Sequence, residues 1–523
     1  MAAMQDSRLS LNGDISRRLY RAIIASLIIT IIIFCFGALA RAGDTSGART
    51  GDRSDIVVDK GSDPGGQAGT LLDEVGHTKV SLNFIWLFLG AILVFFMQAG
   101  FALVETGFCR KKNALHVMMT NFMIFGIGVI GFFLLGYALM FGGLGPLASL
   151  GGKPILTREI AVGGWGLIGG KGFALGGPAY DVGIFSFFLF QVVFMDTAAT
   201  IPTGAMAERW KFSAFCVYGF FMAAIAYPVF GNWVWGGGWL SQLGAKAGFG
   251  HGFVDFAGSS VVHAMGGLAG LMGIIVLGPR FGKFRKDGTP RAVPGHNIPI
   301  AIVGAIFLVF GWFGFNAAST LNGGDLRLAV IAGNTLLASC FGSVTAMFYM
   351  WKRTGNPDPS MSANGALAGL VAITAPCAFV PGWAAAIIGI IAGILVCNAV
   401  FILERRFKID DPVGAVAVHG MNGIWGVLAL GIFADGTYGA GWNGVSGTVR
   451  GALYGNWGQL LAQFIGALTC ILFACGIFYG FFRIQDRVQG IRVAPEVELG
   501  GLDEAEMGVP AYTEEIPEMY TGG

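Results

Sequence analysis

Long apolar runs separated by short polar stretches dominate the chain from residue 80 onward. About 20 consecutive apolar residues are enough for a helix to cross the hydrocarbon core of a bilayer. The pattern therefore predicts an all-α membrane protein. We expect eleven transmembrane helices, near residues 80–108, 113–142, 182–207, 212–237, 256–278, 297–319, 327–351, 363–381, 383–404, 412–433 and 455–482.

Basic residues mark one side of these spans. Lysines and arginines follow every odd-numbered span, for example at Arg110-Lys111-Lys112 and at Arg405-Arg406. The loops after even-numbered spans carry few, apart from one long glycine-rich loop at 143–181. By the positive-inside rule, the first of these spans starts outside and the C-terminus lies in the cytoplasm.

The first 42 residues resemble a targeting segment. Arginines at 17, 18 and 21 precede the apolar run Ala22–Leu39, and Ala40-Arg41-Ala42 has the small-x-small pattern of a cleavage site. We expect this segment to be a cleaved signal peptide rather than a retained helix. The expected domains are a signal peptide at 1–42, a mobile extracytoplasmic leader at 43–79, a transmembrane domain at 80–482 and a cytoplasmic regulatory tail at 483–523.

Two segments of the chain share a pattern. Asp255 is followed by glycine at the third position and by Val-His263 further on, and Asp411 precedes His419 in the same way. An odd span count with such a repeat is typical of transporters built from inverted halves. We expect an inverted five-plus-five repeat with the functional site where the halves meet.

His263 and His419 are the main candidates for chemistry, because an ionisable side chain in a membrane helix is costly. If the repeats pack around a pseudo-two-fold axis, the two imidazoles meet near the midplane. Paired imidazoles can orient a small hydrogen-bonding molecule or relay its proton. The alternatives are two structural histidines or a metal site. Metal is disfavoured because neither helix supplies further ligands at the right spacing, so no metal or cofactor is expected.

Other polar residues have simpler interpretations. Asp255 and Asp411 begin their helices and should cap them; Asp255 can also add negative potential at a pore entrance. Gln98 and Glu105 of the first span are typical of interhelical hydrogen bonding.

Aromatic residues are placed where a cation could enter. Phe190 and Phe194 lie four residues apart on one helical face, Trp235 lies at the outer end of the fourth span, and Phe315 and Ser319 lie near the outer end of the sixth. Aromatic rings at a mouth can hold a small cation by cation–π attraction, and a hydroxyl can accept one of its hydrogen bonds.

Composition agrees with a membrane-embedded function. Of the residues, 54% are hydrophobic and 12% are charged, and the 85 glycines lie within apolar runs, as in closely packed membrane helices. The net charge of +2 gives no indication of nucleic acid as a partner. The eight cysteines have no metal-site spacing and are interpreted as small core residues.

Several segments resemble the ammonium transporter family (Amt/Rh), of the bacterial Amt type. The segment DFAGSSVVHAMGGLAGLMGIIVLGPR, at residues 255–280, resembles the family signature. Further blocks follow in the family's order: MQAGFALVETGFCRKKN at 97–113, GAMAERWKF at 204–212, YPVFGNWVWGGGWL at 227–240, HNIPI and GWFGFNAAS within 296–319, and DDPVGAVAVHG at 410–420.

The resemblance implies a role for each candidate. Trp235, Ser319 and Phe190 would recruit ammonium outside, Phe194 and Phe315 would form the gate, and Asp255 would support the recruitment site. His263 and His419 would be the twin histidines of the conduction path. It further implies an eleven-helix homotrimer in the bacterial inner membrane, one pore per subunit, which deprotonates ammonium and conducts ammonia.

Some positions depart from the family pattern. Gly414 stands where some members have a second aspartate, Met421-Asn422 replaces a more usual Val-Gly, and Ala318 replaces a glycine. The segment GLDEAEMGVPAY at 501–512 resembles the family's regulatory tail with Met507 in place of histidine. In bacterial members a PII signalling protein contacts this cytoplasmic face, so a PII protein is an expected partner.

Two other functions remain open at this stage. An ammonium receptor or sensor would use the same site but should carry an output domain, which the composition of 483–523 does not indicate. A neutral gas channel of the Rh type should lack the cation mouth formed by Trp235 and Ser319.

Overall fold

The computed structural model describes residues 67–145, 147–152 and 156–512. The expected signal peptide and the first part of the expected leader lie outside these residues. The rest of the leader is helical, because α2 begins at Gln67 and continues without a break to Phe108.

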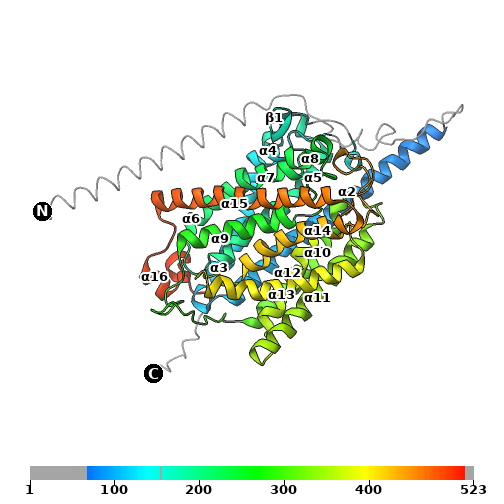
Figure 1. The fold of residues 1–523 in the computed structure, drawn as a ribbon. Coiled ribbons are helices and arrows are strands. Elements are labelled where there is room, and N and C mark those ends of the chain that lie inside the picture. The colour runs from blue at the N-terminus through cyan, green and yellow to red at the C-terminus, as the bar shows by residue number, and fades with distance from the viewer. Residues whose placement is uncertain (1–66, 146, 153–155, 513–523) are drawn as a thin grey trace, which may run out of the picture.

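The helices lie side by side in a single bundle (Figure 1). Among the described residues, ten helices are long and apolar enough to span a membrane. The span at Lys111–Phe141 contains α3 (Ala114–Gly131) and α4 (Tyr137–Phe141), and the span at Phe212–Ala247 contains α6 (Phe212–Phe221), α7 (Tyr227–Val234) and α8 (Trp239–Ala247). The others are α2, α5 (Val182–Ala205), α9 (Met265–Leu277), α10 (Ile298–Ala317), α11 (Leu328–Thr354), α13 (Gly382–Arg405), α14 (Asn422–Phe433) and α15 (Trp457–Gln489).

The eighth expected span is shorter than the rest. It forms α12 (Pro359–Thr374), a helix of 16 residues whose residues from Met361 onward are mostly buried. It packs against α10, α11, α13 and α14, which surround it. The bundle with its shorter eighth helix is consistent with the expected eleven.

Both histidine helices begin with a π-helical turn. One turn covers Ser259–Ala264 before α9, and the other covers Val416–Met421 before α14. Each turn contains its histidine. π turns within α-helices are uncommon and occur frequently at functional sites, so the two halves of the repeat share a local irregularity as well as a sequence pattern.

Glycines let these two helices touch backbone to backbone. A Cβ atom on Gly267 would lie 2.2 Å from the nitrogen of Gly420, and one on Gly423 would lie 2.3 Å from the carbonyl oxygen of Ser259. Small residues permit such close crossings in membranes. The crossing lies next to both histidines in the sequence and fixes their separation.

The long loop after α4 carries a small hairpin. Strands β1 (Glu159–Val162) and β2 (Trp165–Gly169) pair antiparallel, with Val162 opposite Trp165. Gly163 and Gly164 form the turn with φ of 57° and 83°, which glycine adopts without strain.

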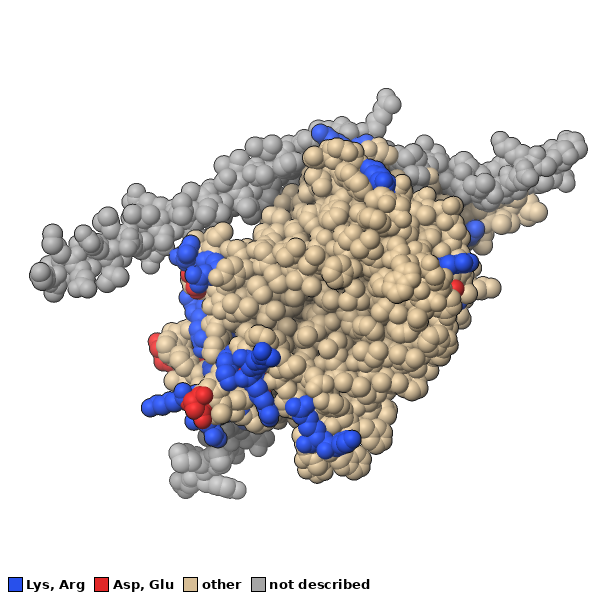
Figure 2. Space-filling model, in the orientation of Figure 1, with Lys and Arg blue, Asp and Glu red and all other residues tan. Residues whose placement is uncertain are grey.

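Charged side chains gather at one end of the bundle. On the face shown in Figure 2, most Lys and Arg lie at the end of the bundle where α16 (Pro495–Gly500) lies, and the middle of that face carries few charges. The tail packs on this end through three carboxylates: Glu498 accepts from the backbone N–H of Phe281, Asp503 from Leu115 and His116, and Glu506 from Phe212.

Candidate functional site

The expected mouth residues surround one cavity at one end of the bundle, here called the outer cavity. The cavity measures about 160 Å³ and is lined by Phe190, Phe194, Trp235, Asp255 and Ser319, among others. The indole N–H of Trp235 donates to the backbone oxygen of Asp255 at 2.6 Å. The hydroxyl of Ser319 donates to the oxygen of Phe315 at 2.8 Å, which leaves its lone pairs available to a donor in the cavity.

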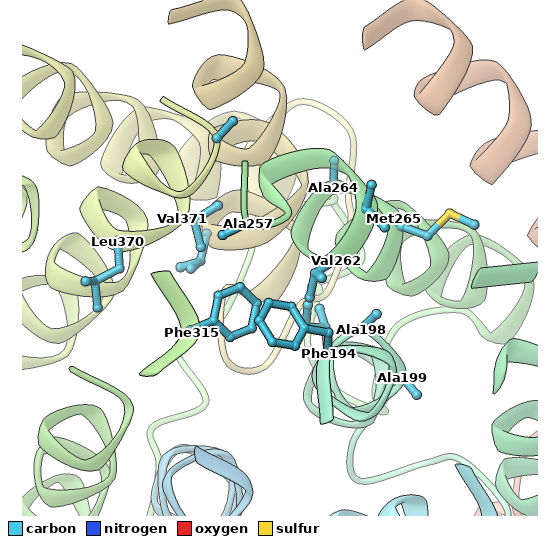
Figure 3. Close-up of a cluster of buried hydrophobic side chains, with 14 of the residues drawn as sticks. Phe194, Ala198, Ala199, Ala257, Val262, Ala264, Met265, Phe315, Leu370 and Val371 are labelled. Carbon is cyan, nitrogen blue, oxygen red and sulfur yellow. The ribbon is translucent and has the colours of Figure 1, made fainter. Parts of the chain in front are cut away.

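Two phenyl rings close the floor of this cavity. The rings of Phe194 and Phe315 lie 4.2 Å apart between centroids with 32° between their planes, and Figure 3 shows them side by side. Phe190 adds a third ring, 4.7 Å from Phe194. A hydrated ion cannot pass this stack unless the rings move.

The two histidines meet directly beyond the phenyl stack. The Nδ1 atoms of His263 and His419 lie 3.2 Å apart, and their ring centroids lie 5.3 Å apart. A hydrogen bond between two Nδ1 atoms requires one ring to donate and the other to accept. The imidazoles therefore act as one polar unit within an apolar pore.

Aromatic contacts fix the orientation of this unit. The ring of His263 stacks on Trp312 at 4.9 Å and on Phe315 at 5.3 Å, and the ring of His419 lies 5.9 Å from Phe101. The Nε2 atom of His263 is buried and has no hydrogen-bond partner among the described residues. That atom is available to a small molecule in the pore.

The two aspartates that precede the histidines are helix caps, as expected. The carboxylate of Asp255 accepts from the backbone N–H groups of residues 258–261, at 2.7–3.1 Å, and from the Ser260 hydroxyl at 2.6 Å. Asp411 accepts from Gly414 and Val416 at 3.0 and 2.7 Å. Gly414 has a φ of 80°, a left-handed conformation that would strain the aspartate found there in some members of the resembled family.

A second, smaller cavity lies on the other side of the histidine pair. It measures about 20 Å³, enough for one water-sized molecule. It is lined by His419 together with Phe101, Val104, Glu105, Ile201, Leu308, Asn364, Leu367, Val413, Ala415 and Val418. The histidines thus separate an outer cavity from an inner one.

Sequence reasoning missed several members of the site. Trp312 lies three residues before Phe315 on the same helical face, a spacing that could have identified it. Phe256, Trp442 and Asn443 also line the outer cavity. Phe256 lies in a loop and the other two in the short 3-10 turn Trp442–Gly444, where no periodicity marks them. Across the described residues, no group of three or more His, Cys, Asp or Glu side chains is arranged to hold a metal ion.

Comparison with known proteins gives one consistent result. A family model described as the Ammonium Transporter Family matches residues 85–512. The chain is 47% identical to the ammonium transporter Amt2 of Archaeoglobus fulgidus over 87% of this chain and 93% of that protein. It is 35% identical to a putative ammonium transporter of Synechocystis, over 84% and 92% of the two chains.

Solved structures agree with the sequences. A protein described as a sensor Amt protein superimposes with a TM-score of 0.72 at 35% identity, covering 82% of this chain and 99% of that one. The Mep2 protein of Saccharomyces cerevisiae superimposes with a TM-score of 0.68 at 27% identity, covering 79% and 88%.

Proposed function

This chain belongs to the ammonium transporter family, and we propose that it recruits ammonium at the outer cavity, removes a proton and passes ammonia along His263 and His419. The observation that carries this proposal is the buried histidine pair, whose Nδ1 atoms lie 3.2 Å apart between two cavities.

Recruitment rests on the chemistry of the outer cavity. Trp235 and Phe190 present aromatic faces to a cation, the Ser319 hydroxyl accepts one N–H hydrogen bond, and Asp255 adds negative potential from below. Such a site favours a small cation that can donate hydrogen bonds. Ammonium has N–H donors, whereas sodium and potassium ions have none.

Deprotonation follows from the dryness of the path beyond. A cation that enters an apolar channel loses its hydration at a cost of several kcal/mol or more. Neutral ammonia has a much smaller cost of desolvation. Phe194 and Phe315 act as the gate that excludes hydrated ions. The histidine pair then offers donors and acceptors to ammonia, and its linked Nδ1 atoms can carry the released proton.

Solid-supported-membrane electrophysiology on proteoliposomes tests the proposal. An ammonium jump should give a saturating current in the wild type that falls at least about tenfold in His263→Ala and in Ser319→Leu. His251→Gln is the matched control, because His251 is a buried histidine that bonds to Gly447 outside both cavities.

Other outcomes of this experiment would support different functions. Absence of current with tight ammonium binding would indicate a receptor, the function that the description of one solved relative suggests for that relative. If no current appears but a pH-sensitive assay detects ammonia flux, the protein would be a neutral gas channel.

We propose further that the protein is a homotrimer in a bacterial inner membrane, with its C-terminus in the cytoplasm. The cluster of Lys and Arg at the α16 end supports this orientation. Native mass spectrometry of the purified protein tests the trimer, and protease access in inverted against right-side-out vesicles tests the orientation.

A PII signalling protein is the proposed partner of the cytoplasmic face. The tail presents a groove at this face, lined by Lys111, Lys112, Glu496, Asp503 and Tyr512, among others. Co-purification of a PII protein with the full chain, and its loss when 491–512 is deleted, would support the partnership; no co-purification would contradict it.

A further inference from the structure

Glu105 faces the inner cavity, where sequence analysis expected only interhelical hydrogen bonding. Its side chain lines the cavity together with His419 and is 2% exposed. One carboxylate oxygen accepts from Asn121 Nδ2 at 2.6 Å and from the Thr203 hydroxyl at 2.7 Å. The Thr203 hydroxyl also lies 3.0 Å from the second carboxylate oxygen. A carboxylate has about four acceptor positions, so these two partners hold the group in place without saturating it.

The inverted repeat gives this position a counterpart at the outer mouth. On α10, Phe315 contacts the ring of His263 and Ser319 follows one turn later toward the outside. On α2, Phe101 contacts the ring of His419 and Glu105 follows one turn later toward the cytoplasm. Each histidine is therefore flanked by a phenylalanine and, four residues on, by a side-chain oxygen at a cavity.

The inner cavity has the chemistry of a cation site. Its walls are apolar apart from Glu105, Asn364 and His419 among the lining residues. Asn364 donates its amide to the oxygen of Val413 at 3.1 Å, which leaves its carbonyl oxygen as an acceptor. A cavity of about 20 Å³ admits one molecule the size of water or ammonium.

We propose that Glu105 forms a second ammonium-binding site at the cytoplasmic end of the pore. The carboxylate balances the charge of one monovalent cation of about the size of ammonium, and it accepts hydrogen bonds from a cation that can donate them. The inference rests on the proposed transport function for its role, but binding at the site does not depend on transport.

Glu105→Gln tests the role in transport, because it keeps the shape and removes the charge. Currents are measured on inverted and right-side-out membrane vesicles that are given ammonium jumps. We expect the half-saturating ammonium concentration to rise about tenfold in inverted vesicles and to change less than about twofold in right-side-out vesicles. Ser319→Ala should show the opposite sidedness.

Asp196→Asn is the matched control. Asp196 is another buried carboxyl of the membrane region, but it lines neither cavity, so both half-saturating concentrations should stay within about twofold of wild type. Thermal unfolding in detergent shows whether each variant is folded. The proposal would be overturned if folded Glu105→Gln had an unchanged half-saturating ammonium concentration in inverted vesicles. An equal rise of that concentration in inverted and right-side-out vesicles would overturn it as well.

Thallium(I), an anomalously scattering monovalent cation, tests binding without transport. Crystals of the wild type soaked in a thallium salt should show an anomalous peak in the inner cavity that Glu105→Gln lacks. A wild type without that peak overturns the inner site. If the wild type carries no current but shows the peak, the proposed transport function fails while the inner site stands.

Discussion

Gly267 and Gly420 meet backbone to backbone at the crossing of the two histidine helices, where a Cβ on Gly267 would lie 2.2 Å from the Gly420 nitrogen. The contact is with main-chain atoms, which cannot turn aside as a flexible side chain can. The spacing of His263 and His419 therefore depends on the absence of a side chain at this crossing.

Gly267→Ala should force the two helices apart. We expect a loss of stability of about 1–3 kcal/mol, typical of overpacking, and at least about a tenfold loss of ammonium current because the histidines separate. Thermal unfolding in detergent and solid-supported-membrane currents measure the two effects. Gly476→Ala is the control: no atom lies within 4 Å of its added Cβ, so both quantities should stay near wild type.

Trp312→Phe should weaken the orientation of His263. The indole stacks on the imidazole at 4.9 Å and donates to the Thr374 hydroxyl at 2.9 Å. A phenyl ring keeps part of the stacking but leaves Thr374 without this donor, at a cost of about 1–3 kcal/mol. We expect the ammonium current to fall severalfold. Trp351 is an exposed tryptophan, so Trp351→Phe is the control and should leave the current unchanged. Equal currents in the two variants would contradict an orienting role.

Phe194→Ala should open the floor of the outer cavity. Removal of one ring of the 4.2 Å pair with Phe315 leaves space for a partly hydrated ion. We expect a potassium current that the wild type lacks, measured with potassium jumps in ammonium-free buffer. Phe122→Ala, at an exposed position, should conduct no potassium. If Phe194→Ala conducts no potassium, Phe194 is not part of the gate.

Asp410 should make the stability of the loops around Arg209 and Arg280 sensitive to acid. Burial would raise the pKa of this carboxyl, but the guanidinium groups of Arg209 and Arg280 outweigh burial and hold the pKa well below its usual range. Because the folded-state pKa is lowered, the stabilisation is complete above the unfolded pKa of about 3.9 and is lost as pH falls further.

The matching variant is Asp410→Asn, which leaves Arg280 without the partner it contacts at 2.8 Å. At pH 7 we expect a loss of about 3–5 kcal/mol, typical of a broken buried ion pair. Thermal unfolding between pH 7 and pH 3 should show the gap between wild type and variant narrowing below about pH 4. A gap independent of pH would mean that the charge of Asp410 contributes nothing.

The sequence predicted five of the residues that line the outer cavity, namely Phe190, Phe194, Trp235, Asp255 and Ser319. Of the residues that line the inner cavity, it predicted a site role only for His419. His263 and His419 were found because a repeat and a buried ionisable group are visible along the chain. Phe190 and Phe194 were found because they share a helical face. Glu105 was assigned to hydrogen bonding, because only the folded structure places it with His419 in the lining of one cavity.

The limits of hydropathy explain the differences in the fold. Residues 67–79 are polar, and a polar helix that extends beyond the bilayer has no apolar run to reveal it. The π turns at Ser259–Ala264 and Val416–Met421 lie where the two histidine helices touch, and no local sequence rule identifies such turns.

The short helix α12 has a consequence for how the chain is made. Its 16 residues reach about 24 Å, less than the hydrocarbon thickness of about 30 Å, and its surroundings are other helices. Lipid alone would not retain it, so the translocation machinery must release it together with α11 and α13. A nascent chain arrested after Thr374 would be expected to leave this segment outside the bilayer until α13 emerges from the ribosome.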